Sequence, residues 1–119
     1  MDTELAAKRL SALAHVSRLD VFRLLVRAGH EGLPAGQIAR TLGTTANTLS
    51  AQLSILTNAG LARSRRAGRS IIYAADFDGM SELLAHLMED CCQGRPEICA
   101  PAAKLAARAA RCQPQGGRA

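Results

Sequence analysis

The sequence predicts a mainly α-helical fold with one small β-hairpin. Aromatic residues make up only 3% of the 119 residues, whereas apolar residues make up 48%. The core must therefore be built from aliphatic side chains, which favours helices over sheets. Apolar residues recur at helical spacing along most of the chain, and the period changes to an alternation between residues 61 and 75. The length suits one domain with a modest core.

The first two predicted helices precede residue 30. One covers residues 3–15, with apolar positions at Leu5, Leu10 and Leu13. The second follows Ser17, which we expect to cap it, and ends at Gly29. Its apolar face is predicted to consist of Leu19, Phe22, Leu25 and Val26. Both helices are therefore expected to be amphipathic.

The next two predicted helices are separated by a tight turn. Pro34 suits the first turn of a short helix that stops at Gly43, and Thr44 or Thr45 can cap the helix that follows. This longer helix has a predicted buried stripe at Leu49, Leu53 and Leu56. Its opposite face carries short, mostly polar, uncharged side chains, namely Asn47, Thr48, Ser50, Ala51 and Gln52.

Residues 61–75 predict a β-hairpin with a basic tip, because Gly68 lies near the middle and arginines surround it. Asp76 or Asp78 can cap a further helix that Gly94 and Pro96 stop. The apolar stripe predicted for this helix is Leu83, Leu84, Leu87, Met88 and Cys91.

The short helix, the glycine turn and the longer helix together predict a helix-turn-helix, and the hairpin would be its wing. The longer helix fits a major groove, where Asn47 and Gln52 can pair with adenine. The wing arginines Arg65, Arg66 and Arg69 would hold phosphates or enter the minor groove. A basic hairpin alone can also be a solvated face. The ordered combination with a helix-turn-helix favours binding to double-stranded DNA, as does the net charge of +5.

These motifs resemble the ArsR/SmtB family of metal-responsive winged-helix repressors. The resemblance covers roughly residues 5–92, through LAHVSRLDVFRLL and QIARTLGTTANTLSAQLSILTNAGLARSRRAGRSIIY. It implies a homodimer joined by its first and last helices and released from its operator by an inducer. The implied base contacts are Thr45, Ala46, Asn47, Ser50 and Gln52, and Thr48 lies on the same face. Val16 stands where the family commonly has proline, and Ala51 and Gln52 where it often has histidine or arginine.

Three of the four cysteines, Cys91, Cys92 and Cys99, fall within nine residues. Thiolates select soft ions, and a trivalent metalloid binds three of them in a pyramid. Gly94 and Pro96 would let the chain fold back to bring the third cysteine near. The cluster also resembles the C-terminal Cys-Cys…Cys site of an arsenic-sensing branch of the family. That resemblance favours As(III), with Sb(III) also considered, as the inducer, without an organic cofactor.

Other roles for these cysteines stay open. Cys112 could complete a structural zinc site, although adjacent cysteines are unusual in such sites. The thiols could sense redox state or another soft metal, or Cys91 could simply pack at a helix end. A zinc site between the last helices is not expected, because that stretch has His86 as its one histidine. The helix before the recognition helix has no cysteine.

These features together favour a cytoplasmic arsenite-responsive repressor, not an enzyme. His15, His30 and His86 lie in separate predicted elements, and no phosphate-binding glycine loop is present. No apolar run is long enough for a membrane span. The alternatives are a repressor of the same fold sensing redox state or another soft metal, or an arsenic-binding carrier. The expected division is a DNA-binding and dimerisation domain at 1–93 and a C-terminal extension at 94–119, which holds the sensor loop, a basic alanine-rich helix and a disordered tail.

Overall fold

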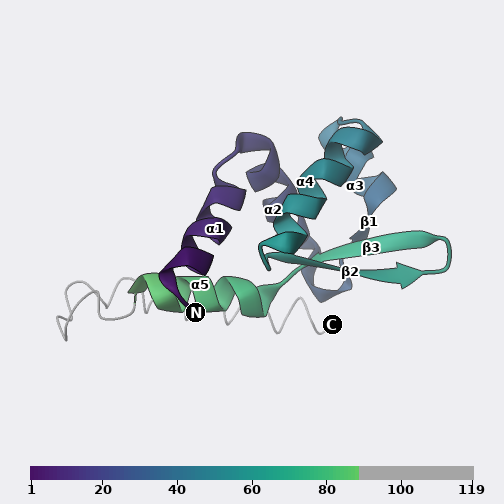
Figure 1. Ribbon diagram of the computed structural model, residues 1–119. Coiled ribbons are helices and arrows are strands. Elements are labelled where there is room, and N and C mark those ends of the chain that lie inside the picture. Colours follow the sequence, from purple (N-terminus) through teal and green to yellow (C-terminus); the bar gives the residue numbers. More distant parts are fainter. Residues whose placement is uncertain (89–119) are drawn as a thin grey trace.

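The computed structural model describes residues 1–88, and Figure 1 shows how its elements are arranged. The chain forms five α-helices, one short 3-10 turn and three strands in this part. In order they are α1 (Thr3–Leu13), α2 (Val16–Ala28), η1 (Gly29–Glu31), β1 (Leu33–Pro34), α3 (Ala35–Leu42), α4 (Ala46–Asn58), β2 (Ala62–Ala67), β3 (Ser70–Ala75) and α5 (Phe77–Met88). The predicted fold class, mainly helical with a small hairpin in a winged helix-turn-helix order, is confirmed.

The sheet is antiparallel with strand order β1-β3-β2. Strands β2 and β3 form the predicted hairpin, with Ala67 opposite Ser70 at its tip. Strand β1 was not predicted, because two residues carry no periodic signal. It adds an edge to the sheet by pairing Leu33 with Tyr73 and Pro34 with Ile72. Proline is tolerated there because an edge strand does not need every N–H group.

An aliphatic core lies between helices α2, α3 and α4 and the base of the hairpin. Its fully buried side chains include Leu25, Ile38, Leu56 and Leu61. The predicted stripe of α4 is confirmed, since Leu49, Leu53 and Leu56 are all buried. Burying a side chain of this size contributes roughly 1.5–3 kcal/mol. The core therefore fixes α4 from one side and leaves its other side exposed.

Helix α1 packs through a face other than the predicted one. The sequence predicts an apolar face at Leu5, Leu10 and Leu13, but Leu10 is exposed. The buried positions are Ala6, Arg9 and Ala12. Two alanines let the helix backbone approach its neighbours closely, and the buried arginine finds carbonyl partners there.

Helix α2 begins two residues before the position expected from the sequence. Its N-cap is His15, whose Nδ1 accepts the N–H of Ser17 at 3.2 Å, so the prediction that Ser17 caps it is wrong. Val21, Phe22 and Leu25 are buried, whereas Leu19 and Val26 are exposed. The buried face is therefore turned slightly from the predicted one, because the position of α4 decides which side of α2 is covered. Gly29 ends the helix as predicted.

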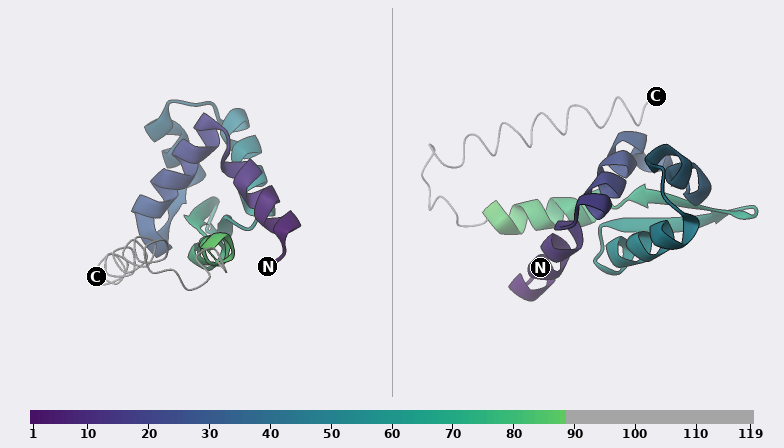
Figure 2. Two further views of the ribbon diagram at one scale, coloured as in Figure 1. Left: turned by 90° about the vertical axis from the view of Figure 1, so that its left-hand side faces the viewer. Right: turned by 90° about the horizontal axis from the view of Figure 1, so that it is seen from above.

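The hairpin and α5 extend in opposite directions from the helical core, as Figures 1 and 2 both show. Helix α5 begins after Asp76, whose side chain accepts the N–H of Gly79 at 2.9 Å, so Asp76 is the cap. Helix α1 packs against both α4 and α5. None of the helices in residues 1–88 is long and apolar enough to cross a membrane.

Candidate nucleic-acid interface

Helices α3 and α4 form the predicted helix-turn-helix around a tight turn. Gly43 ends α3 in the left-handed conformation, with φ of 67°. A residue without Cβ adopts this conformation without strain, which explains why the helix stops there. Thr45 then caps α4, because its Oγ1 accepts the N–H of Thr48 at 3.2 Å and donates to the Thr48 hydroxyl at 2.9 Å. The hydroxyl of Thr45 is thus partly engaged in holding the helix N-terminus.

The N-terminal half of α4 is exposed on the side opposite the core. Exposed positions that the sequence predicts for base contact are Thr45, Ala46, Asn47, Thr48 and Ser50. Ala51 and Ser54 extend the same exposed surface with small side chains. Small side chains allow a helix to approach base edges closely. The geometry of this surface suits insertion into a major groove.

Gln52 differs from the other predicted contact residues. It is half-buried and lines a cavity of about 90 Å³ with Ser17 and Asp20 of α2. Gln52 therefore lies at the boundary between α4 and α2, on a cavity that Asp20 also lines. Its role in base contact stays a prediction.

The wing carries its arginines on both faces and at its tip. Arg63 lies opposite Ala74 and Arg65 opposite Ile72, whereas Arg66 lies opposite Ile71 one step along the pleat. Because side chains alternate across a strand, Arg63 and Arg65 share one face and Arg66 lies on the other. Gly68, with φ of 64°, and Arg69 form the two-residue turn. All four arginines are exposed.

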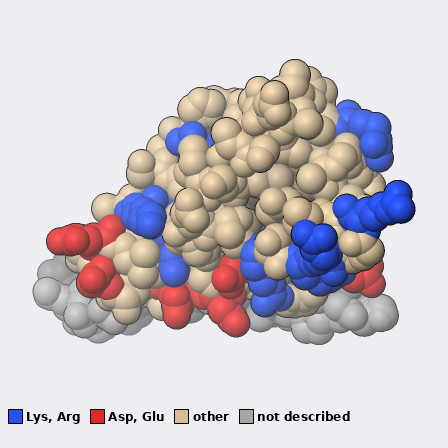
Figure 3. Space-filling model, turned by 45° about the vertical axis from the view of Figure 1, so that its right-hand side comes forward, with Lys and Arg blue, Asp and Glu red and all other residues tan. Residues whose placement is uncertain are grey.

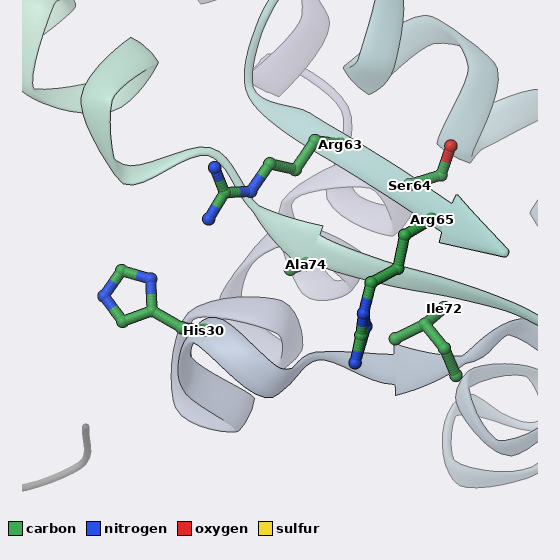
Figure 4. Close-up of a pocket in the computed structure, with 6 residues that line it drawn as sticks. All are labelled: His30, Arg63, Ser64, Arg65, Ile72 and Ala74. Atoms are coloured by element: carbon green, nitrogen blue, oxygen red, sulfur yellow. The ribbon is translucent and has the colours of Figure 1, made fainter. Parts of the chain in front are cut away.

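A shallow pocket of about 150 Å³ lies at the base of the wing (Figure 4). Arg63 and Arg65 extend from β2 on this side, whereas Ser64 points to the other. Arg65 Nη2 donates to the carbonyl oxygen of Glu31 at 3.1 Å. The ring of His30 lies edge-on to Phe77, with centroids 4.9 Å apart. Arg65 is therefore partly held against η1, unlike Arg66 and Arg69 at the outer end of the hairpin.

The charge is unevenly distributed over the surface. Figure 3 shows the larger groups of lysine and arginine atoms at the centre and right of the view, smaller ones on the left, and acidic atoms along the lower edge. Within residues 1–88 one ion pair forms, between Arg9 and Glu82. The wing arginines are thus not neutralised by carboxylates of this part of the chain. A cluster of exposed cations beside a polar helix face suits the phosphates of DNA.

A second surface carries exposed apolar side chains on α1 and α5. Leu10 is 42% exposed, Leu84 53% and Leu87 44%. Of the stripe predicted for α5, Leu83 is buried in the monomer, whereas Leu84, Leu87 and Met88 are exposed. His86 of α5 lies within 3.4 Å of the Thr3 hydroxyl of α1, so the two helices are side by side.

The predicted thiolate site falls outside the described residues. Cys91, Cys92, Cys99 and Cys112 all follow residue 88, so the proposed As(III) ligands stay a prediction. Among residues 1–88, no group of three histidine, cysteine, aspartate or glutamate side chains could hold a metal ion.

Sequence reasoning missed Arg9. Its side chain is buried, and it donates to carbonyl oxygens of two other elements. The available signal was its position three residues after Ala6 and three before Ala12, on a stripe that a search for large apolar residues passes over.

Comparisons with known proteins agree with this geometry. A family model of a helix-turn-helix domain matches residues 13–65. The HTH-type transcriptional regulator NmtR of Mycobacterium tuberculosis is 36% identical over 87 residues, which cover 71% of this chain and 70% of NmtR. The nodulation protein NolR of Rhizobium meliloti is 33% identical over 88 residues, 74% of this chain and 70% of NolR.

A solved structure is also similar to this chain. It is the homodimeric winged helix-turn-helix DNA-binding domain of Mb0332 from Mycobacterium bovis. The TM-score is 0.60 at 27% identity, and the match covers 71% of this chain and 83% of that one. That domain is described as a winged helix-turn-helix, the architecture whose recognition helix and wing form the candidate interface here.

Proposed function

The chain belongs to the ArsR/SmtB family of winged-helix transcriptional regulators, and from this premise we propose that it is an arsenite-responsive repressor. In this proposal a homodimer binds operator DNA through α4 and the wing. Binding of As(III) to the thiolates of Cys91, Cys92 and Cys99 then releases the DNA. The observation that carries the sensor proposal is the cysteine cluster itself, which begins three residues after the last residue of α5.

The DNA-binding part of the proposal is supported by two neighbouring features. The exposed half of α4 offers Asn47 and Ser50 for hydrogen bonds to base edges. Arg66 and Arg69 lie at the outer end of the wing, where they would neutralise phosphates. Neither arginine forms an ion pair with a carboxylate in residues 1–88.

The dimer is supported by the apolar surface of α1 and α5. Leu10, Leu84 and Leu87 are each more than 40% exposed in the monomer. A second copy of the chain would bury these side chains, and the two α4 helices would then face successive major grooves about 34 Å apart. Sedimentation of the purified protein at micromolar concentration should give the mass of two chains.

Release by arsenite is proposed to act through α5. This helix carries the exposed apolar side chains and leads directly to Cys91. Drawing three thiolates onto one ion would move the end of α5 and thus shift the dimer contacts. Coupling of this kind requires that the ion bind the DNA-free state more tightly, by typically 1–3 kcal/mol.

Fluorescence anisotropy of a labelled operator tests the proposal. The DNA upstream of the gene is titrated with the full chain under reducing conditions, and then arsenite is added. We expect binding and then release, with release lost in the Cys91→Ser, Cys92→Ser and Cys99→Ser variants. Cys112→Ser is the matched control and should still respond.

Other results would assign other functions. Release by an oxidant or by a different soft metal, but not by arsenite, would identify the alternative sensor of the same fold. Absence of DNA binding under all conditions, with arsenite still bound by the thiols, would favour a carrier protein.

A further inference from the structure

The side chain of Arg9 connects three elements that lie far apart in the sequence. Arg9 belongs to α1 and is only 7% exposed. Its Nε donates to the carbonyl oxygen of Ala59 at 2.8 Å, and its Nη1 donates to the carbonyl oxygen of Gly79 at 2.7 Å. Nη1 also lies 3.1 Å from Glu82 Oε1. One guanidinium group therefore joins α1 to the end of α4 and to the first turn of α5.

The geometry of this contact is rigid. A guanidinium group presents its donors in a fixed planar fork, so two carbonyl partners determine its orientation. The backbones are also in close contact, because a Cβ atom at Gly79 would overlap the carbonyl oxygen of Gly60. A Cβ at Gly60 would lie 2.8 Å from Arg9 Nη2. The junction thus leaves little room for α5 to move relative to the end of α4.

The elements joined at Arg9 have different roles in the proposed repressor. Helix α4 would read DNA with its N-terminal half, whereas Ala59 is the cap at its other end. Helices α1 and α5 carry the exposed apolar side chains that would form the dimer. Helix α1 packs against both α4 and α5, and Arg9 donates to the backbone of both, so Arg9 lies where the angle between the reading helix and the dimer helices can be restrained.

We propose that Arg9 is a positioning residue that sets the separation of the two recognition helices in the dimer, and thereby the operator half-site spacing that the protein accepts. The inference rests on the proposed function, because it requires a dimer that binds two half-sites. Arg9 itself lies at the far end of α4 from the predicted base contacts and acts through Ala59 and Gly79.

A small tilt at the Ala59 end of α4 produces a large displacement at the other end of the helix. The 13 residues of α4 span about 20 Å at 1.5 Å per residue. A tilt of about 10° at the Ala59 end moves the N-terminal end of α4 by roughly 3.5 Å, which is about one base-pair step. A small loss of restraint at Arg9 is therefore enough to change which half-site spacing is accepted.

The test measures binding of the full chain to a set of operators. The spacing between half-sites is shortened or lengthened by one and two base pairs, and a single half-site is included. Two base pairs rotate one half-site by about 70° relative to the other, so we expect wild-type affinity to fall by ~10-fold or more. In Arg9→Met the difference between spacings should shrink to about 3-fold or less, because the recognition helices are no longer held at one separation. Single half-site binding should change little.

Arg18→Met is the matched control. Arg18 Nε donates to the carbonyl oxygen of Ala12 at 2.7 Å and its Nη2 to that of Ser11 at 3.3 Å. It therefore joins α2 to the end of α1 without reaching α4 or α5. This variant should keep the wild-type spacing profile, even where its melting temperature falls.

Two further variants test the positioning role of Arg9 if Arg9→Met does not fold. Arg9→Lys keeps the charge but cannot hold both carbonyl oxygens with a planar fork. Gly79→Ala forces α5 away from Gly60 while Arg9 is retained. Both should broaden the spacing profile.

A folded Arg9→Met or Arg9→Lys protein with the wild-type spacing profile would overturn the inference. Equal broadening by Arg18→Met would also overturn it, because the effect would then come from loosened α1 packing in general. Wild-type protein that binds no DNA, or binds only as a monomer, contradicts the proposed function instead, so the two failures are distinguishable.

Discussion

Arg9 and the wing arginines are the same residue type in opposite environments. Arg9 is buried and its donors are directed to backbone carbonyls within the chain. Arg66 and Arg69 are exposed and extend from the outer end of a hairpin that points away from the helical core (Figure 1). A charge that the protein itself satisfies holds elements together, whereas a charge left in solvent is available to a polyanion. Substitutions in both environments test this contrast, in decreasing order of expected effect.

Replacing Arg9 with methionine should have the largest effect on stability. The carbonyl oxygens of Ala59 and Gly79 would lose a buried donor, and each unsatisfied buried group costs about 1–3 kcal/mol. We expect the free energy of unfolding in urea to fall by about 3 kcal/mol. Arg66→Met is the control in the wing and should stay within ~0.5 kcal/mol of wild type. Equal losses of unfolding free energy in Arg9→Met and Arg66→Met would contradict the contrast between the buried and the exposed arginines.

Replacing Arg66 and Arg69 with alanine should affect DNA binding and leave stability unchanged. If each arginine neutralises one phosphate, each substitution should reduce the slope of log affinity against log salt by about 1. The loss should be similar for all DNA sequences, because phosphates carry no sequence information. Anisotropy titrations at four salt concentrations measure the slope. An unchanged slope would mean that the wing does not contact the backbone.

Replacing Thr45 with alanine should have a smaller effect on the free energy of unfolding. Thr45 caps α4 and also belongs to the exposed surface that is predicted to contact bases. Thr45 Oγ1 accepts the N–H of Thr48 at the start of α4, and loss of such a cap costs typically ~1 kcal/mol. Thr45→Ser retains the hydroxyl and should keep wild-type stability in the same urea unfolding experiment. A Thr45→Ala protein with the wild-type free energy of unfolding would show that the core alone fixes the N-terminus of α4.

Replacing Glu82 with glutamine should have the smallest effect. The Glu82 side chain is 61% exposed, and exposed ion pairs contribute about 0–1 kcal/mol. We expect this substitution to lower the free energy of unfolding by less than ~1 kcal/mol. A double-mutant cycle with Arg9→Met should give a small coupling energy. A coupling above ~2 kcal/mol would show that the ion pair, not the carbonyl contacts, holds the junction.

The sequence was informative where a local signal acts alone. Gly43 and Gly29 end helices where they were expected to, because residues without Cβ adopt positive φ readily. The stripe of Leu49, Leu53 and Leu56 was correctly predicted from its spacing. The alternation in residues 61–75 likewise predicted the hairpin.

Predictions failed where side-chain contacts in the folded backbone decided the outcome. The choice of Ser17 as a cap was wrong, because His15 reaches the N–H of Ser17 from outside the helix. The buried face of α1 was misjudged because Ala6 and Ala12 are small, and close approach rather than side-chain size decides burial there. The base-contact residues, the wing contacts and the thiolate ligands stay predictions, and Cys91, Cys92 and Cys99 lie beyond the described residues.

The amino-acid sequence alone specifies the order of the elements, the helix-turn-helix and the basic hairpin, because periodicity, capping residues and glycines act over a few neighbouring residues. Tertiary packing, in contrast, determines which arginine side chains bind carbonyl oxygens within the protein and which remain exposed to solvent. The alanines at i−3 and i+3 indicate a close-packed helix face, but neither they nor the residue type reveals the carbonyl partners that set Arg9 apart from Arg66. The two arginines differ because the carbonyl oxygens of Ala59 and Gly79, which lie 50 and 70 positions further along the chain, converge on Arg9 in the folded protein.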